Sequence, residues 1–248
     1  MNRSRLYPLV LMVGLLISLS ESVSAQRAAL QSSPPVKSAA EPFIEEARRQ
    51  IDNGLAKGAL RSLGIAIGKD RSAAEAYLLR GKAYDMLGMP QKALEDLDRF
   101  VQMRPSDPAG YIGRGDLKNF NMQHEAAVDD YSMAAKLAPS SVSPFLGRGL
   151  ALAAMGKYKE AIKDYQWALR LDPNHVEALE NMGLAYMHSG RPLEAVTYFE
   201  KALNLEKNPT WRQKIQSWID ELLQEAAATA EKRQGPTRAP TGSLRRMW

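Results

Sequence analysis

Residues 142–175 read VSPFLGRGLALAAMGKYKEAIKDYQWALRLDPNH, and the pattern of this stretch recurs along the chain at a spacing of 34 residues. An alanine occupies the same place in five successive copies: Ala59, Ala93, Ala127, Ala161 and Ala195. In every copy a small residue stands twelve positions before this alanine, and large apolar residues stand sixteen positions before it and four after it. A period of this length indicates an array of repeated structural units.

The spacing inside each copy predicts two helices. The first large apolar residue and the small residue are four apart, so they share one helix face, and the alanine and the large residue that follows it mark a face of a second helix. Between the two helices, four copies carry a residue suited to the left-handed end of a helix: Gly54, Gly88, Gly156 and Gly190. Three copies close with a proline, which stops the second helix: Pro105, Pro139 and Pro173.

A 34-residue helix–turn–helix with these columns resembles the tetratricopeptide repeat, and LGMPQKA at 87–93 and MGKYKEA at 155–161 are typical of its turns. We assign five repeats, residues 40–73, 74–107, 108–141, 142–175 and 176–209. The resemblance implies an all-α, right-handed superhelical α-solenoid of about five helix pairs, followed by a C-terminal capping helix at 210–231. Lys118 in an apolar column and Met122 at the turn glycine make the first helix of the third repeat the least regular.

The N-terminal residues have the layout of a secretory signal peptide. Arg3 and Arg5 precede an apolar run, Leu6 to Leu19, and Ala25 offers a cleavage site. The alternative is an uncleaved membrane anchor, but this run is shorter than the roughly 20 residues that span a bilayer. We therefore expect residues 1–25 to be removed and the mature chain to be periplasmic or secreted. Ser- and Pro-rich residues 26–39 are expected to form a flexible linker.

The basic character of the chain is concentrated at its C-terminal end. Residues 26–225 contain 26 Lys and Arg against 26 Asp and Glu, whereas residues 226–248 contain five basic residues against Glu231 alone. A neutral body gives little affinity for phosphates, so we expect no nucleic-acid partner. Residues 232–248 are predicted to form a disordered basic tail. Its end, Arg245 to Trp248, suits an anionic interface, and this supports the alternative of a membrane-surface or cell-wall attachment protein.

The sequence predicts no catalytic activity, no metal site and no cofactor. The chain has no cysteine, and its three histidines, His124, His175 and His188, fall in different repeats without metal-ligand spacing. Trp211 and Trp218 could form a ligand cage, but their spacing on the predicted capping helix favours a place in the core.

Arginine and aspartate recur together in the three central repeats. Arg80, Arg114 and Arg148 share one column, and Asp96, Asp130 and Asp164 share another, sixteen residues later. The arginines could grip an acidic ligand, or each could form a structural ion pair with the aspartate of its own repeat. The fifth repeat has lost both residue types, with Met182 and Tyr198 in their places, and this joint loss favours the structural pair.

The resemblance implies a function in binding another protein. In the family the concave face is lined by first helices and presents the second, fifth, ninth, twelfth and thirteenth positions of each repeat. From the fifth, ninth and twelfth positions we select these partner-binding candidates: Leu78, Lys82, Asp85, Ile112, Asp116, Asn119, Leu146, Leu150, Leu184 and Met187. Some members of the family grip acidic chaperone tails with a lysine at the fifth position and an asparagine at the ninth. No repeat of this chain has either residue at that position. The apolar C-terminal half of this face fits a peptide or helical segment, unless these side chains pack between neighbouring first helices.

The signal peptide gives a first test. Because cleavage is expected after Ala25, intact-mass measurement of the exported protein should place its N-terminus at Gln26. A mature form that retains Arg3 and Arg5 would instead support the membrane-anchor alternative.

Overall fold

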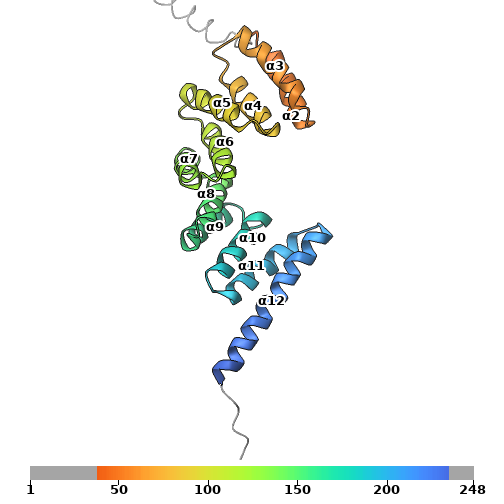
Figure 1. The fold of residues 1–248 in the computed structure, drawn as a ribbon, viewed down its shortest axis with the longest axis vertical. Helices are drawn as coiled ribbons and strands as arrows, with labels where there is room; N and C mark the ends of the chain where they lie inside the picture. The colour runs from red at the N-terminus through yellow and green to blue at the C-terminus, as the bar shows by residue number, and fades with distance from the viewer. Residues whose placement is uncertain (1–37, 235–248) are drawn as a thin grey trace, which may run out of the picture.

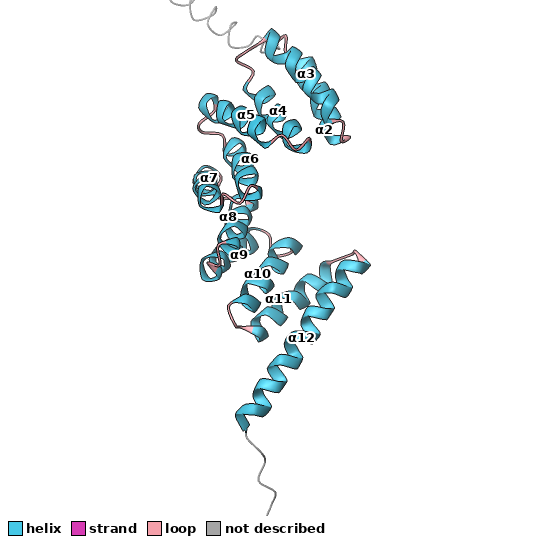
Figure 2. Cartoon of the chain, viewed as in Figure 1, coloured by secondary structure: helices cyan, strands magenta, loops and turns pink. Residues whose placement is uncertain are grey.

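The computed structural model describes residues 38–234 (Figure 1). The predicted signal peptide, nearly all of the predicted linker and residues 235–248 lie outside this part. The described chain is made of eleven helices joined by short turns, without a strand (Figure 2). In chain order these are α2 (Glu41–Asp52), α3 (Ala56–Lys69), α4 (Ala74–Met86), α5 (Pro90–Met103), α6 (Pro108–Phe120), α7 (His124–Leu137), α8 (Val142–Ala154), α9 (Tyr158–Leu171), α10 (Val176–His188), α11 (Pro192–Leu205) and α12 (Pro209–Gln234).

The helices stack in pairs into a superhelical α-solenoid (Figure 1). Each assigned repeat contains one pair, and every helix packs against the next along the chain. Within residues 38–234 the first helices of neighbouring repeats touch, as α4 touches α6, whereas second helices of neighbouring repeats stay further apart. The stack therefore curves with its first helices on the inner face.

The turns between paired helices follow the glycine pattern. Gly88 and Gly156 have φ values of 67° and 73°, which an L side chain rarely adopts. In the third repeat Met122 takes the same left-handed conformation, with φ 61°. Helix α6 nevertheless has the same length as α4, α8 and α10, so the irregular residues did not prevent it from forming.

Aromatic rings set against glycine hold neighbouring helices together, both within a repeat and between two repeats. The ring of Tyr131 on α7 is almost completely buried, and a Cβ atom added at Gly147 of α8 would lie 2.4 Å from it. Within the fourth repeat, a Cβ atom added at Gly149 of α8 would lie 2.5 Å from the ring of Tyr165 on α9. The small-residue column, at Gly115, Gly149 and Gly183, therefore marks places where a helix backbone lies directly on an aromatic side chain of its partner helix.

Helix α12 covers the last repeat. Its buried residues Ile215, Ile219 and Leu222 belong to the core cluster of the C-terminal repeats. Trp218 packs against Phe199, with ring centroids 5.3 Å apart, and the Trp211 indole donates a hydrogen bond of 2.5 Å to Glu180 on α10. The two tryptophans thus fasten α12 to the solenoid rather than forming a ligand cage.

Two predicted boundaries need correction. Helix α12 continues to Gln234, so residues 232–234 of the predicted disordered tail are helical; the alanine-rich residues before them favour continuation of the helix. The predicted flexible linker also ends earlier than residue 39, because the Ser38 hydroxyl donates to Asp70 at 2.7 Å and Ala40 is fully buried. None of the helices in residues 38–234 is long and apolar enough to cross a bilayer.

The glycine contacts predict opposite effects for the same substitution at two sites. Gly147→Ala should lower the free energy of unfolding by about 1–3 kcal/mol, because its methyl group overlaps the buried Tyr131 ring. Gly64→Ala, in the middle of α3 with open space around it, should raise that free energy by about 0.5–1 kcal/mol. Urea unfolding of both variants checks the pair, and equal effects would contradict the close-contact explanation.

Candidate functional site

The recurring arginines and aspartates form bidentate ion pairs within each repeat. Nε and Nη2 of Arg80 both lie 2.7 Å from the carboxylate of Asp96. The corresponding distances are 3.0 and 2.6 Å for Arg114 with Asp130, and 2.8 and 2.6 Å for Arg148 with Asp164. All three aspartates are buried. These arginines are therefore part of the framework and do not project freely into the concave face.

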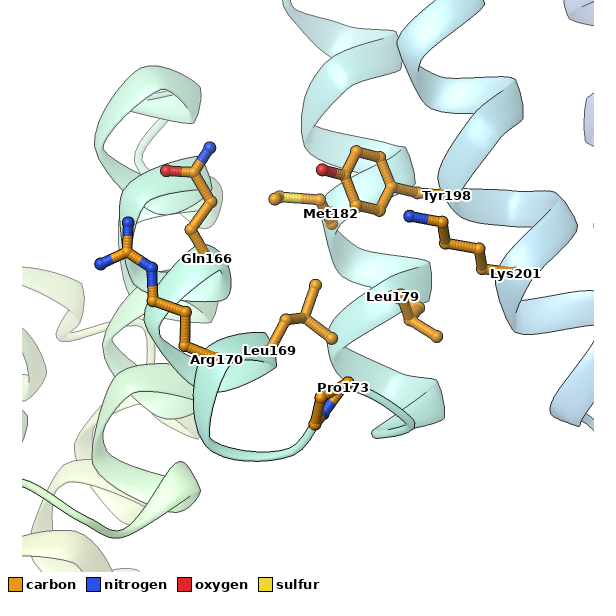
Figure 3. A pocket seen from close by; sticks show the side chains of 8 residues that line it. All are labelled: Gln166, Leu169, Arg170, Pro173, Leu179, Met182, Tyr198 and Lys201. Atoms are coloured by element: carbon orange, nitrogen blue, oxygen red, sulfur yellow. The ribbon is translucent and has the colours of Figure 1, made fainter.

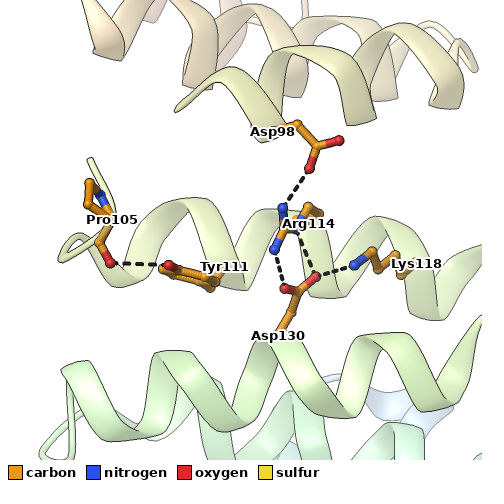
Figure 4. A network of polar contacts seen from close by, with 6 residues as sticks. All are labelled: Asp98, Pro105, Tyr111, Arg114, Lys118 and Asp130. Carbon is orange, nitrogen blue, oxygen red and sulfur yellow. Dashed lines mark hydrogen bonds and ion pairs between the residues drawn. The ribbon is translucent and has the colours of Figure 1, made fainter. Parts of the chain in front are cut away.

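Two of these arginines, Arg114 and Arg148, also reach the second helix of the preceding repeat. Nη1 of Arg114 donates to Asp98 on α5 at 2.5 Å, so this side chain joins α5 and α7 across α6 (Figure 4). Nη1 of Arg148 donates to Ser132 on α7 at 3.1 Å. The hydrogen bond to its own aspartate is the main reason that the pKa of each guanidinium is raised. We call these contacts the arginine ladder.

Lys118 completes the ladder in the third repeat. This residue occupies a column that is apolar in the regular repeats, and its Nζ lies 2.7 Å from the Asp130 carboxylate (Figure 4). Its irregularity is therefore compensated by an additional ion pair.

Five of the ten partner-binding candidates line one cavity of about 500 Å³ on the inner face. Leu78, Lys82 and Asp85 come from α4, and Ile112 and Asp116 come from α6. Leu97 and Leu117 form further apolar walls. We call this cavity the α4–α6 cleft. It combines an apolar interior with charged side chains on both first helices.

Asp116 is a carboxylate of this cleft that is both hydrogen-bonded to the framework and shifted in pKa. The buried Tyr131 donates its phenolic hydrogen to Asp116 at 2.7 Å. Desolvation raises the pKa of Asp116, with a further contribution from the charge of Asp85, while the hydrogen bond from Tyr131 acts in the opposite direction. Burial and this hydrogen bond raise the pKa of Tyr131, which keeps the phenol as a donor. Tyr131 thus connects the inner face to the ring–glycine packing described above.

A second cavity of about 550 Å³ continues the cleft toward the inter-helix turns. It shares Asp85, Asp116 and Leu117 with the cleft and extends to Phe120. Phe120 is 81% exposed and Met122, at the adjoining turn, is 76% exposed. Phe120 was missed by sequence reasoning because only the fifth, ninth and twelfth positions were considered; it occupies the thirteenth position of its repeat.

The other five candidates differ in their accessibility. Asn119 is held by His124, with Oδ1 2.7 Å from Nδ1. Leu146 is only 8% exposed, and Leu150, Leu184 and Met187 pack against the C-terminal core cluster. The accessible apolar stripe in the C-terminal half stays a prediction, since Leu150, Leu184 and Met187 are only partly buried. Residues 38–234 contain no cluster of histidine and carboxylate side chains suited to a metal ion.

Comparison with known proteins supports the repeat assignment. A family model described as tetratricopeptide repeat matches residues 44–108 and 146–210. No curated protein is similar enough to match this chain. The crystal structure of MamA is 29% identical, with a TM-score of 0.59 over 64% of this chain and 93% of that chain.

Two further solved structures share the fold at lower identity. YrrB, described as a TPR protein with an unusual peptide-binding site, is 21% identical and has a TM-score of 0.58, with 77% of this chain and 97% of that chain covered. TTC0263 of Thermus thermophilus, described as a thermophilic TPR protein, is 22% identical and has a TM-score of 0.60, with 73% and 99% covered.

The ladder predicts a large effect of removing one arginine. Arg148→Met leaves Asp164 buried without its partner, and because the Arg148 side chain is 24% exposed we expect a loss of about 2–4 kcal/mol in the free energy of unfolding. Adding Asp164→Tyr, the residue of the fifth repeat, should recover at least half of this loss. A double-mutant cycle measured by urea unfolding gives the coupling between the two sites.

Arg49→Met is the matched control, because Arg49 pairs with Glu46 at an exposed position of α2. It should leave the free energy of unfolding nearly unchanged, because solvent screens an exposed ion pair. Additive effects of the Arg148 and Asp164 substitutions would mean that the pair is not a structural unit.

Proposed function

Because this chain belongs to the tetratricopeptide repeat family, whose members serve as protein-interaction scaffolds, we propose that its α4–α6 cleft binds an extended peptide segment of another protein. The preferred segment carries a bulky apolar side chain next to a lysine or arginine. We also propose that the protein has no catalytic role and acts in the periplasm or outside the cell, as the signal-like residues 1–25 suggest.

The cleft itself is the observation that carries this proposal. Its volume of about 500 Å³ and its leucine and isoleucine walls suit one large apolar side chain. Asp85 and Asp116 lie where a neighbouring cation would face two carboxylates, and both side chains are exposed enough to receive it. Lys82, one turn before Asp85 on α4, disfavours a peptide with a second cation on that side.

The third turn adds an apolar rim beside the cleft. A methionine at φ 61° costs on the order of 1 kcal/mol relative to glycine, the residue of the other turns. The Met122 side chain is largely exposed, so the fold recovers little of this cost through packing. A strained residue with an exposed apolar side chain, close to an equally exposed Phe120, supports a role in contacting a partner.

Selection of a random peptide library on the mature protein tests the proposal. Bound sequences should be enriched in a large apolar residue adjacent to a basic one. The double variant Asp85→Asn with Asp116→Asn should bind a selected peptide about tenfold more weakly, since it removes about 1.4 kcal/mol of electrostatic attraction. Isothermal titration calorimetry measures the difference.

Asp129→Asn provides the control, because Asp129 is exposed on α7 and lines neither cavity. It should leave the affinity unchanged. Met122→Gly should weaken binding without lowering thermal stability, which would separate the contact made by this side chain from any effect on the fold. Enrichment of acidic peptides, or equal binding by the Asp85 and Asp116 double variant, would contradict the proposal.

A further inference from the structure

The arginine ladder is interrupted in the fifth repeat. In the third and fourth repeats, Nη1 of the arginine reaches a residue sixteen positions earlier, Asp98 or Ser132. At the corresponding places of the fifth repeat stand Met182, in the arginine column, and Gln166, sixteen positions earlier. A methionine has no guanidinium group to cross between α9 and α11, so the buried Met182 makes none of the ladder contacts here.

A cavity of about 380 Å³ occupies this place (Figure 3). Gln166 and Arg170 come from α9, Tyr198 and Lys201 come from α11, and Met182 comes from α10 between them. Leu169, Pro173 and Leu179 complete an apolar interior. We call this cavity the α9–α11 pocket. Its lining includes α9 and α11, both second helices, so it is distinct from the α4–α6 cleft between first helices.

The charged lining of the pocket is entirely cationic. Arg170 and Lys201 are exposed, and neither takes part in an ion pair within residues 38–234. Each cation lies over an aromatic ring, Arg170 at 4.8 Å from the centroid of Trp167 and Lys201 at 5.1 Å from that of Tyr198. No carboxylate lines the pocket, in contrast to the ladder, where a buried aspartate neutralises each arginine.

Two neutral hydrogen-bond donors accompany the cations. In the preceding repeats Asp98 and Ser132, at the position of Gln166, each accept a hydrogen bond from an arginine. The fifth repeat has Met182 in the arginine column, so the Gln166 amide has no such arginine partner. The Tyr198 ring stacks on Tyr186 with a centroid separation of 5.3 Å, and the Tyr198 side chain also belongs to the pocket lining. Burial raises the pKa of this phenol, so it remains protonated and able to donate. Donors and cations around an apolar interior are complementary to an anion on an apolar group.

We propose that the α9–α11 pocket binds the free C-terminus of a partner polypeptide that ends in an aliphatic residue. The terminal carboxylate lies between Arg170 and Lys201, and the last side chain rests on Leu169 and Pro173, the accessible apolar residues of the lining. A pocket of this volume is at the lower end of the range for small ligands, about 300–1,000 Å³, and suits one terminal residue better than a helix.

The test uses the hexapeptide Gly-Ser-Gly-Ser-Gly-Leu with a free carboxylate, its C-terminal amide, and N-acetyl-leucine as a free small carboxylate. Each is titrated into the full mature chain and followed by amide shifts in nuclear magnetic resonance spectra. The acid should bind at least tenfold more tightly than the amide, with shifts at α9, α10 and α11. Equal binding of acid and amide, or no binding of either, overturns the proposal. N-acetyl-leucine binding more tightly than the hexapeptide overturns the assignment to a chain terminus.

The chain itself supplies the matched variant. Met182→Arg with Tyr198→Asp restores the ladder residues of the three central repeats, fills the pocket and offers Gln166 a partner, so it should abolish binding. If that variant does not fold, Arg170→Gln with Lys201→Gln takes its place and should reduce binding at least tenfold. Lys163→Gln, an exposed change on α9 outside the pocket, should have no effect. Undiminished binding by the folded variants overturns the proposal. The Asp85 and Asp116 double variant should bind the hexapeptide normally, which keeps the two sites distinguishable.

Discussion

Contact between an aromatic ring and a glycine backbone is the constraint on which the rest of this structure depends. Tyr131 occupies the space that a side chain at Gly147 would take, and Tyr165 does the same at Gly149. Such contacts let consecutive helices approach closely: Tyr165 joins the two helices of one repeat, and Tyr131 also joins the third repeat to the fourth. Packing of every helix on the next makes one continuous stack of the helix pairs. Because every repeat is packed on its neighbours, the positions of both candidate sites follow from this packing.

The arginine ladder fixes the relative orientation of the helices that this packing brings together. Ring–glycine contacts are apolar and tolerate small rotations, whereas a bidentate guanidinium fixes the orientation of the two helices it joins. Arg114 joins α5, α6 and α7, so it sets the rotation between two repeats as well as within one. Where Met182 replaces the arginine, the fifth repeat lacks this ion pair, and that is where α12, with Trp211 and Trp218, closes the stack.

The two candidate sites use departures from the repeat pattern. On the inner face, Phe120 at the end of α6 and Met122 in the following turn are apolar and exposed. Among the five turns that join the two helices of a repeat, this turn has methionine in place of glycine. On the opposite helices, the pocket beside Met182 opens where the ladder is missing. In a repetitive framework the regular columns are needed for stacking, so residues that depart from them are free to acquire a binding role. The balanced charge of the body leaves local charge to decide partner preference at each site.

The sequence by itself determined the local features of this protein. The 34-residue period, the helix pairs and the pairing of Arg148 with Asp164 all follow from residue types at fixed spacing, because they arise within one repeat. Only the tertiary structure decided which inner-face residues are accessible. Leu78 and Ile112 face a cleft, whereas Leu146 is buried, although all three occupy the fifth position of their repeats. Accessibility depends on how each repeat is rotated against the next, and that rotation is set by contacts between residues far apart in the chain.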